Sequence, residues 1–183
     1  MNFTAKEVLL RDGRTCILRA PRAEDAGALI DYLKTIAGES EYILWTSLEP
    51  FPTMEQEISY IERLVQSPQD LCLVAEVEGE IAGNCQINFQ GKWKVAHRSS
   101  IAIALKKKFW GLGIGTALLG ELLAEAERRG VRQTELDVVA ENVRARALYE
   151  KMGFRVVATL PDAIRFTDGT FHDEIRMMRL NRI

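Results

Sequence analysis

Three glycines in five positions precede a run of residues with the pattern of a helix. The stretch W-G-L-G-I-G-T-A-L-L covers residues 110–119, and its glycines are Gly111, Gly113 and Gly115. A helix N-terminus carries unpaired backbone N–H groups and a partial positive charge of roughly half a unit. Without side chains in the way, a phosphate group can approach those donors closely. The alternative is structural: a tight turn with positive φ, or close packing of the helix on a sheet.

Two well-known phosphate-binding loops do not fit this stretch. A P-loop has a lysine directly after its last glycine, but Thr116 and Ala117 follow here. A dinucleotide-binding loop has the spacing G-x-G-x-x-G, whereas this sequence has G-x-G-x-G. The glycines therefore predict a phosphate site of another class.

A second segment with chemical potential, E-N-V-R-A-R-A-L-Y-E-K-M-G-F, covers residues 141–154. Asn142, Ala145 and Tyr149 are three and seven positions apart, so they lie on one face of a helix. That face would present an amide, a gap above a small residue, and a phenol two turns further on. A half-buried tyrosine with its hydroxyl at the rim is the structural alternative. Beside a phosphate-binding turn, we expect Tyr149 to be functional.

Both segments resemble the acetyl-CoA-binding region of the GNAT N-acetyltransferase superfamily. The first is similar to the pattern R/Q-x-x-G-x-G/A, with Gly113 and Gly115 as its glycines and Trp110 where arginine or glutamine is usual. The second is similar to N-x-x-A-x-x-L/F-Y-x-K/R-x-G-F, matched from Asn142 to Phe154. The resemblance covers roughly residues 72–181 and implies a GNAT fold and transfer of an acetyl group to an amine.

The resemblance also implies contacts for acetyl-CoA as the cosubstrate. The pantetheine arm would pair with the backbone of the strand at 99–105 and with Asn142, and the diphosphate would lie on the N–H groups of 112–116. The lysines at 106–108, Lys151 or Arg146 would meet the adenosine phosphates, although at least two of the three consecutive lysines are expected simply to be solvated. The expected coenzyme contacts are Ile103, Leu105, Trp110, Gly111, Leu112, Gly113, Ile114, Gly115, Thr116, Asn142, Ala145, Arg146, Tyr149 and Lys151.

Transfer from a thioester to an amine requires a neutral amine and a protonated thiolate leaving group. An alkylammonium has a pKa of about 10 and a thiol one of about 8.5. We expect Tyr149 to be the general acid that protonates the thiolate. For the general base, Glu39 is the first candidate, and Glu41 and His97 are the alternatives. The resemblance implies direct transfer in a ternary complex, without an acyl-enzyme.

Composition limits which other classes of protein and site the sequence could represent. The chain has 183 residues, 47% of them hydrophobic and 27% charged, which predicts one domain over residues 1–183. The three cysteines (Cys16, Cys72 and Cys85) lie among apolar residues outside both segments, as expected for core residues in a reducing cytoplasm. No spacing of His and Cys predicts a metal site, and no apolar run approaches the roughly 18 residues of a membrane span. A pI of about 5.8 disfavours a nucleic-acid partner.

Charge is distributed unevenly along the chain. Residues 21–80 carry thirteen acidic and three basic residues, whereas residues 81–183 carry eleven acidic and seventeen basic ones. This division predicts that the second half holds an anionic ligand and the first half attracts a cationic one. We therefore expect a polyamine, amino-sugar or peptide amine as the acceptor.

The predicted elements form a mixed α/β (α+β) domain, with a mostly antiparallel sheet of about seven strands flanked by about four helices. Turns are expected at Asp12-Gly13 and at residues 78–80, irregular loops at 38–52 and 161–173, and helix ends at Gly38, Gly130 and Gly153. The main predicted helices cover 22–37, 54–66, the run after the glycine turn to 129, and 141–152. The main predicted strands cover 15–20, 70–77, 81–90, 99–105, 133–140, 154–160 and 174–180.

A non-catalytic acyl-CoA-binding regulatory module on the same fold is the alternative function. It would bind the coenzyme and transfer nothing. The intact Tyr149 and the acidic residues of the expected acceptor loops favour the enzyme. A homodimer is one expected assembly, since dimers are common among the proteins that the chain resembles.

Overall fold

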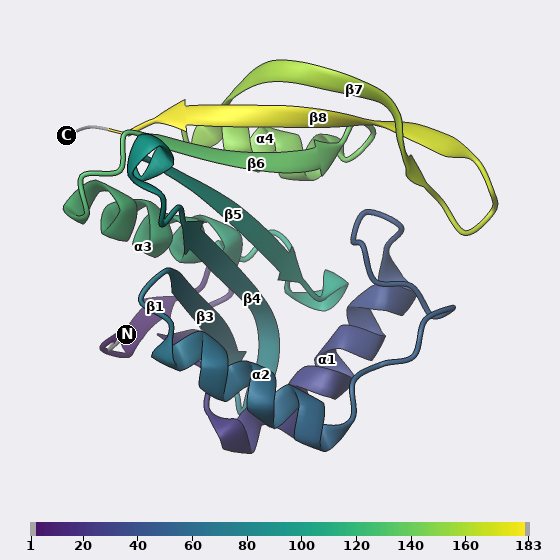
Figure 1. Cartoon of the computed structure of the whole chain (residues 1–183). Helices are drawn as coiled ribbons and strands as arrows, with labels where there is room; N and C mark the ends of the chain where they lie inside the picture. Colours follow the sequence, from purple (N-terminus) through teal and green to yellow (C-terminus); the bar gives the residue numbers. More distant parts are fainter. Residues whose placement is uncertain (1–2, 182–183) are drawn as a thin grey trace.

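Eight strands form one sheet in the order β1-β2-β3-β4-β5-β6-β8-β7 in the computed structural model, which describes residues 3–181 (Figure 1). Every pairing of neighbouring strands is antiparallel except that of β5 with β6. The strands are β1 (Lys6–Leu9), β2 (Thr15–Arg19), β3 (Asp70–Val77), β4 (Glu80–Phe89), β5 (Arg98–Leu105), β6 (Gln133–Val139), β7 (Arg155–Arg165) and β8 (Phe171–Leu180). The mostly antiparallel mixed sheet is confirmed, with eight strands where about seven were expected.

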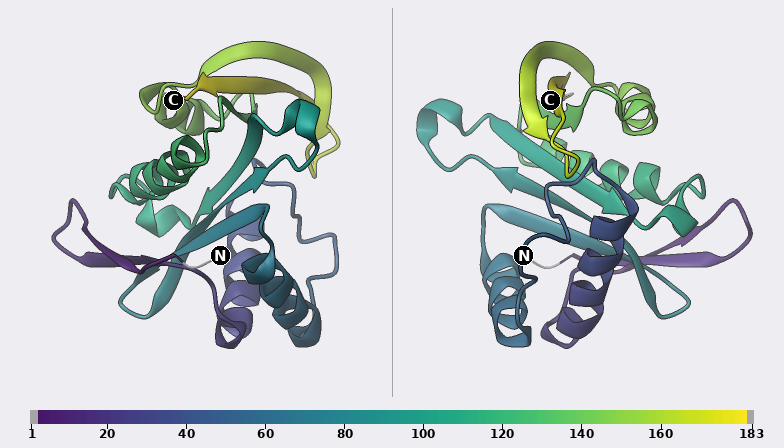
Figure 2. Two further views of the ribbon diagram at one scale, coloured as in Figure 1. Left: turned by 60° about the vertical axis from the view of Figure 1, so that its left-hand side comes forward. Right: turned by 90° about the vertical axis from the view of Figure 1, so that its right-hand side faces the viewer.

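Within residues 3–181, four α-helices cover the two faces of the sheet, as predicted. Helices α1 and α2 lie on one face, and α3 and α4 lie on the other (Figures 1 and 2). Their bounds are α1 (Ala26–Glu39), α2 (Met54–Gln66), α3 (Ile114–Arg128) and α4 (Val143–Lys151), with short 3-10 turns η1 (Ala23–Asp25), η2 (Trp93–Val95) and η3 (Lys107–Phe109).

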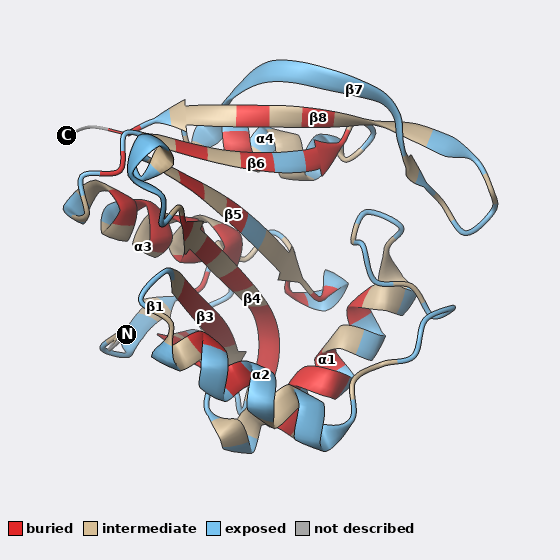
Figure 3. Ribbon diagram, in the orientation of Figure 1, coloured by how far each residue is buried: buried red, intermediate tan, exposed pale blue. Residues whose placement is uncertain are grey.

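Apolar side chains form a separate core on each face. The larger core joins α3 to the sheet through Leu118, Leu119 and Leu122, all fully buried, and appears as the buried stripe of α3 in Figure 3. The smaller core joins α1 and α2 to β3 and β4, with Tyr32 and Ile61 among its members. Each helix therefore buries one stripe against the sheet, as its spacing of apolar residues requires.

Local signals in the sequence specify most of the boundaries. Helix α2 begins with a reciprocal cap: the Gln56 backbone amide donates to Thr53 Oγ1 (3.3 Å), and the Thr53 backbone amide donates to Gln56 Oε1 (2.8 Å). The turn between β3 and β4 has positive φ at Glu78 and Gly79, which is the geometry of a two-residue hairpin turn. The turn predicted at 78–80 is confirmed.

Two predicted boundaries are wrong. Helix α1 does not end at Gly38 but continues to Glu39, and Ser40 has an extended backbone. The predicted loop at 161–173 is mostly strand, because β7 extends to Arg165 and β8 begins at Phe171. Pro161 is tolerated since β7 is an edge strand and its register shifts between Leu160 and Ile164. Pro161 lies in this irregular segment, outside the paired positions, so its missing N–H removes no bond from the ladder.

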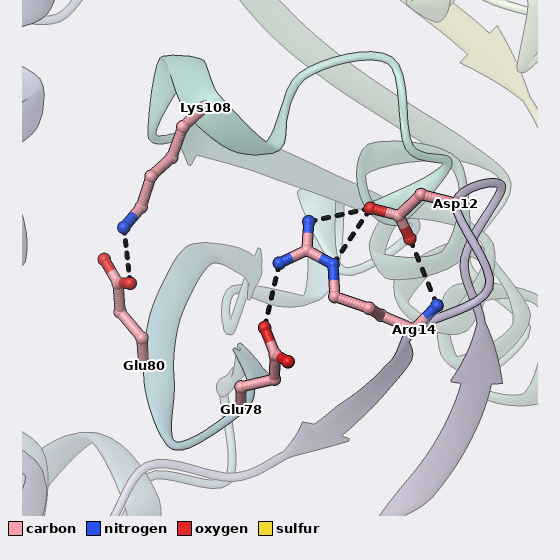
Figure 4. A network of polar contacts seen from close by, with 5 residues as sticks. All are labelled: Asp12, Arg14, Glu78, Glu80 and Lys108. Carbon is pink, nitrogen blue, oxygen red and sulfur yellow. Dashed lines mark hydrogen bonds and ion pairs between the residues drawn. The ribbon is translucent and has the colours of Figure 1, made fainter.

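The turns at one end of the sheet are tied together by ion pairs. Arg14, beside the β1–β2 turn, bonds Asp12 at 2.7 Å and Glu78 at 3.0 Å (Figure 4). Glu80 accepts from both Lys106 and Lys108, which flank the start of η3. This network fixes the segment that leads into the glycine turn.

Candidate active site

A fork between β5 and β6 opens the sheet at its centre (Figure 1). The two strands pair only over three positions, Arg98 to Ser100 with Gln133 to Glu135, whereas β5 pairs with β4 from Ser99 to Leu105. The Lys106 amide donates to Ala82 of β4, and the bonding direction alternates along an antiparallel strand. The backbone N–H and C=O groups of Ile101, Ile103 and Leu105 therefore face the fork. A cleft of about 1210 Å³ fills this opening.

The glycine turn lies at one end of the cleft, and each of its glycines has a specific reason. Gly111 and Gly113 have φ of +82° and +101°, a conformation that L side chains disfavour. Gly115 is required by packing, because a Cβ atom there would lie 3.0 Å from Leu148 Cδ2 and 3.2 Å from Leu105 Cδ1. The needs for positive φ and for close packing thus explain why these three residues are glycines. They do not explain what the backbone amides of the turn could bind.

Those amides are available at the start of α3. The first intrahelical bond runs from the Ala117 amide to Gly113 O (3.1 Å), and within residues 3–181 no partner is found for the N–H groups of Ile114, Gly115 and Thr116. All three residues line the cleft. The carbonyls of Gly111 and Leu112 instead accept from Arg11, whose Nη1 and backbone N–H each lie 3.2 Å away. The turn therefore presents donors to the cleft, whereas Leu112 itself does not line it.

Trp110 holds the base of the turn against β5. Its indole Nε1 donates to the Leu105 carbonyl (2.8 Å), so one of the fork-facing backbone groups already has a partner. The Arg144 guanidinium lies 4.8 Å from the centre of the Trp110 ring, and both residues line the cleft. Sequence reasoning missed Arg144, because an arginine that stacks on an aromatic ring has no characteristic spacing in the sequence. The aromatic residue Trp110, three positions before Gly113, is only a weak signal of such a contact.

Tyr149 is predominantly buried but reaches the cleft. It is 6% exposed, packs edge-on against Phe154 with ring centres 6.1 Å apart, and lines the cleft. No residue among 3–181 is hydrogen-bonded to its hydroxyl. Burial, and then the proximity of Cys85, raise the pKa of the phenol above its ordinary value. The hydroxyl therefore keeps its proton and can donate it into the cleft.

The remaining predicted contacts on α4 divide into two groups. Asn142, Ala145 and Lys151 line the cleft, and Asn142 Oδ1 caps α4 by accepting from the Ala145 amide (3.1 Å). Arg146 does not line the cleft: its Nη1 donates to the Ala140 carbonyl (2.9 Å). Of the Asn142 side chain, only the amide nitrogen remains available to bind a ligand.

The lysines before the turn are mostly engaged elsewhere. Lys106 is 8% exposed and, like Lys108, is paired with Glu80. The structure thus gives two of the three lysines a structural role. Lys107 Nζ lies 5.9 Å from the centre of the Trp110 ring.

The three candidates for the general base lie in different places. Glu39 lines the cleft at the end of α1, where its Oε2 accepts from the Lys107 amide (2.7 Å). Glu41 also lines the cleft, but both of its carboxylate oxygens accept from Thr167. His97 is exposed at the far end of β5 and does not line the cleft.

The loop after α1 touches the β7–β8 turn. Besides the bonds from Thr167 to Glu41, the rings of Tyr42 and Phe166 lie 6.0 Å apart, and Phe166 stacks on His172 with ring centres 3.7 Å apart. The side of the cleft that Glu41 lines is therefore bridged by two segments far apart in sequence.

Carboxylates on this side come from both halves of the chain. Glu39 and Glu41 belong to the acidic first half, but Glu135, Asp137 and Glu174 belong to the basic second half and also line the cleft. The carboxylates that line the cleft therefore do not follow the division of charge along the sequence. The alternation of acids in Q-T-E-L-D-V-V (133–139) is the signal that could have revealed two of these residues, since alternate residues share one face of a strand.

The cysteines are buried and free, as predicted. Burial raises the pKa of the Cys16 thiol to about 11 and that of the Cys72 thiol to about 12, and it raises that of Cys85 as well. A thiol with a high pKa is a poor nucleophile. Over residues 3–181, no cluster of three or more His, Cys, Asp or Glu has the arrangement of a metal site, and no helix there is long and apolar enough to span a membrane.

Comparisons with known proteins agree with this geometry. The sequence model of the acetyltransferase (GNAT) family matches residues 31–154. An acetyltransferase of Pectobacterium atrosepticum is 32% identical over 123 residues, which are 65% of this chain and 82% of the relative. The L-amino acid N-acetyltransferase AaaT of Escherichia coli is 28% identical over 99 residues, 54% of this chain and 61% of the relative. Among solved structures, a GNAT acetyltransferase of Streptococcus pneumoniae superposes with a TM-score of 0.84 at 26% identity, covering 90% of this chain and 99% of that one.

Proposed function

Because the chain belongs to the acetyltransferase (GNAT) family, we propose that its central cleft binds acetyl-CoA and transfers the acetyl group to a primary amine of a small molecule or peptide. The observation that carries this proposal is the fork: β5 and β6 separate after three residue pairs, directly beside a turn of free amides. The cleft also contains a buried phenol. One continuous sheet, with a core on each face, supports treating residues 1–183 as a single catalytic domain.

The glycine turn provides the seat for the diphosphate. The amides of 112–116 lie at the start of α3, and those of Ile114, Gly115 and Thr116 have no other partner within residues 3–181. Positive φ at Gly111 and Gly113 directs the backbone without placing side chains over it. Lys151 and Arg144 line the same cleft and supply positive charge near the adenosine phosphates. Arg146 would have to leave the Ala140 carbonyl to join them.

The edge of β5 provides the seat for the pantetheine arm. Its amides would pair with both backbone groups of Ile103 and with the N–H of Leu105, since Trp110 already occupies the Leu105 carbonyl. The side-chain nitrogen of Asn142 is placed to add a donor. The arm would then run along the fork towards Tyr149.

The residues of the cleft divide the work of the reaction. The acceptor nitrogen attacks the thioester carbonyl carbon, the C–S bond breaks, and Tyr149 donates a proton to the departing thiolate. The raised pKa of Tyr149 keeps the phenol protonated across the physiological pH range. Buried thiols with raised pKa values support direct transfer rather than an acyl-enzyme, and they suit a reducing cytoplasm.

The acceptor is best matched by a slender, cationic amine. Six carboxylates line the cleft (Glu39, Glu41, Glu135, Asp137, Glu141 and Glu174), and they attract a protonated amine. The bridge between Glu41 and Thr167 favours a small amine or an extended chain end over a folded protein surface.

An acetylation assay with a panel of amines tests the proposed function. The purified protein is incubated with acetyl-CoA and polyamines, amino sugars, amino acids or peptides, and free thiol and product mass are followed. Thiol release together with a gain of one acetyl group on an amine is expected. Tight binding of CoA without transfer to any amine would instead indicate a non-catalytic acyl-CoA-binding module.

A further inference from the structure

Three carboxylates lie on the face of the sheet that carries α1. Glu135 and Asp137 alternate along β6, Glu174 lies on the neighbouring strand β8, and all three line the cleft. Arg98 Nη2 donates to both oxygens of Glu135 (2.9 and 2.8 Å). Arg176 binds Asp137 through two bonds of 2.8 Å each.

Glu174 differs from the other two. Within residues 3–181, no hydrogen bond or ion pair holds its carboxylate, although the side chain is partly buried. Its cross-strand neighbours are Val139 on β6 and Leu160 on β7, both apolar. A carboxylate without a partner in a cleft is free to accept a proton, whereas a carboxylate held by an arginine is stabilised as the anion.

The charged groups around Glu174 favour its use as a proton acceptor. Asp137 on β6 and Arg176 on β8 are its nearest charged neighbours, with Glu39 and Glu41 across the cleft on α1 and the loop that follows it. Burial, and then the negative charge of Asp137, raise the pKa of Glu174, while Arg176 opposes the rise. A general base is most effective when its pKa lies close to the working pH.

The chemistry of the acceptor requires such a group. An alkylammonium has a pKa of about 10, so almost all of the bound amine is charged at neutral pH and must lose a proton before or as it attacks. Glu39 is less suited, since one of its oxygens accepts from the Lys107 amide. Glu41 is bound through both oxygens.

Building on the proposed function, we propose that Glu174 is the general base of the transfer. Its carboxylate takes one proton from the acceptor ammonium and releases it to solvent. The neutral nitrogen forms a bond to the carbonyl carbon, and the C–S bond breaks as the thiolate receives a proton from Tyr149. The nitrogen then gives up its second proton, which restores the phenol of Tyr149. No oxidant, reductant or metal ion is needed for the balance.

The replacement Glu174→Gln tests this role, because it preserves size and removes the base. With the best acceptor of the panel, we expect kcat/KM at pH 7 to fall by about 10²–10⁴-fold. The difference in kcat/KM between wild type and Glu174→Gln should become smaller above pH 9, because the free amine then forms without a general base. The variant Glu174→Asp should retain part of the wild-type activity. The affinity for CoA and the urea unfolding midpoint should stay at wild-type values. Glu62→Gln, an exposed site on α2, is the matched control.

The possible outcomes distinguish a failure of the role of Glu174 from a failure of the proposed acetyltransferase function. Wild-type activity and an unchanged pH profile in Glu174→Gln would overturn the role of Glu174 while the acetyltransferase function stands. Loss of activity in Glu39→Gln with Glu174→Gln unaffected would assign the base to Glu39 instead. A wild-type protein that binds CoA and acetylates none of the amines would overturn the proposed function, and the role of Glu174 with it.

Discussion

The phenol of Tyr149 offers a variant in which stability and activity should change independently. Its hydroxyl is bonded to none of the residues 3–181, although the side chain is only 6% exposed. The hydroxyl opens on the cleft, so removing it breaks no hydrogen bond within those residues and leaves no buried donor or acceptor unpaired, a loss that would cost about 1–3 kcal/mol. We therefore expect Tyr149→Phe to have a free energy of unfolding equal to that of the wild type, or up to about 1 kcal/mol higher.

Activity should fall sharply in the same variant. Loss of a positioned general acid lowers turnover by about 10²–10⁴-fold, which corresponds to about 2.7–5.4 kcal/mol at 1.36 kcal/mol per factor of ten. In the wild type, the raised pKa of Tyr149 means that its ionisation should not reduce turnover until the pH exceeds about 10. The affinity for CoA should change little, because the proposed diphosphate contacts are backbone amides of the turn, which the substitution does not alter.

Thiol release at saturating substrates and urea unfolding together provide the assay. Tyr60→Phe is the matched control, since Tyr60 lies on α2 and does not line the cleft. Unaltered turnover of Tyr149→Phe across the pH range would remove the residue from the mechanism. A loss of stability above about 1 kcal/mol with activity intact would show that the phenol is only a packing residue.

Two further predictions concern stability. Gly115→Ala should lower the free energy of unfolding by about 1–3 kcal/mol, because the new Cβ would approach Leu148 and Leu105 to 3.0 and 3.2 Å; a urea midpoint equal to that of the wild type would show that the packing can relax. Arg19→Ala should cost roughly 3 kcal/mol, because the buried Arg19 holds Asp25 at 2.6 Å. Burial alone would raise the pKa of Asp25, but the bond from Arg19 and other hydrogen bonds lower it overall. The wild type should therefore lose the stabilisation from the Arg19–Asp25 pair as the pH falls below about 4. If the free energy of unfolding of Arg19→Ala depended on pH between 3 and 6 as strongly as that of the wild type, this prediction would be contradicted.

Local signals placed the glycine turn and one face of α4 correctly, and both line the cleft. The spacing of Gly111, Gly113 and Gly115, and the helical face of Asn142, Ala145 and Tyr149, are encoded within short segments. A turn with positive φ and a helix cap are determined by neighbouring residues. Both segments could therefore be placed correctly from the sequence.

The grouping of carboxylates from β6 and β8 in the cleft depends on strand pairing and could not be predicted in the same way. Asp137 and Glu174 become neighbours only because β8 inserts between β6 and β7, and no local pattern specifies that order. The fork likewise follows from the register of β5 and β6, which stop pairing after Ser100. Pro161 signalled a loop, yet at a sheet edge it is compatible with a strand. Tertiary context decided each of these features.

A crystal structure of the protein with acetyl-CoA is the most direct measurement of how the coenzyme is held. We expect the diphosphate oxygens to lie about 2.7–3.2 Å from the amides at the start of α3, and the sulfur to lie within hydrogen-bond reach of the Tyr149 hydroxyl. A diphosphate bound away from Gly113, Ile114 and Gly115, or a sulfur remote from that hydroxyl, would contradict the assignment of the turn and the phenol to a single catalytic cleft.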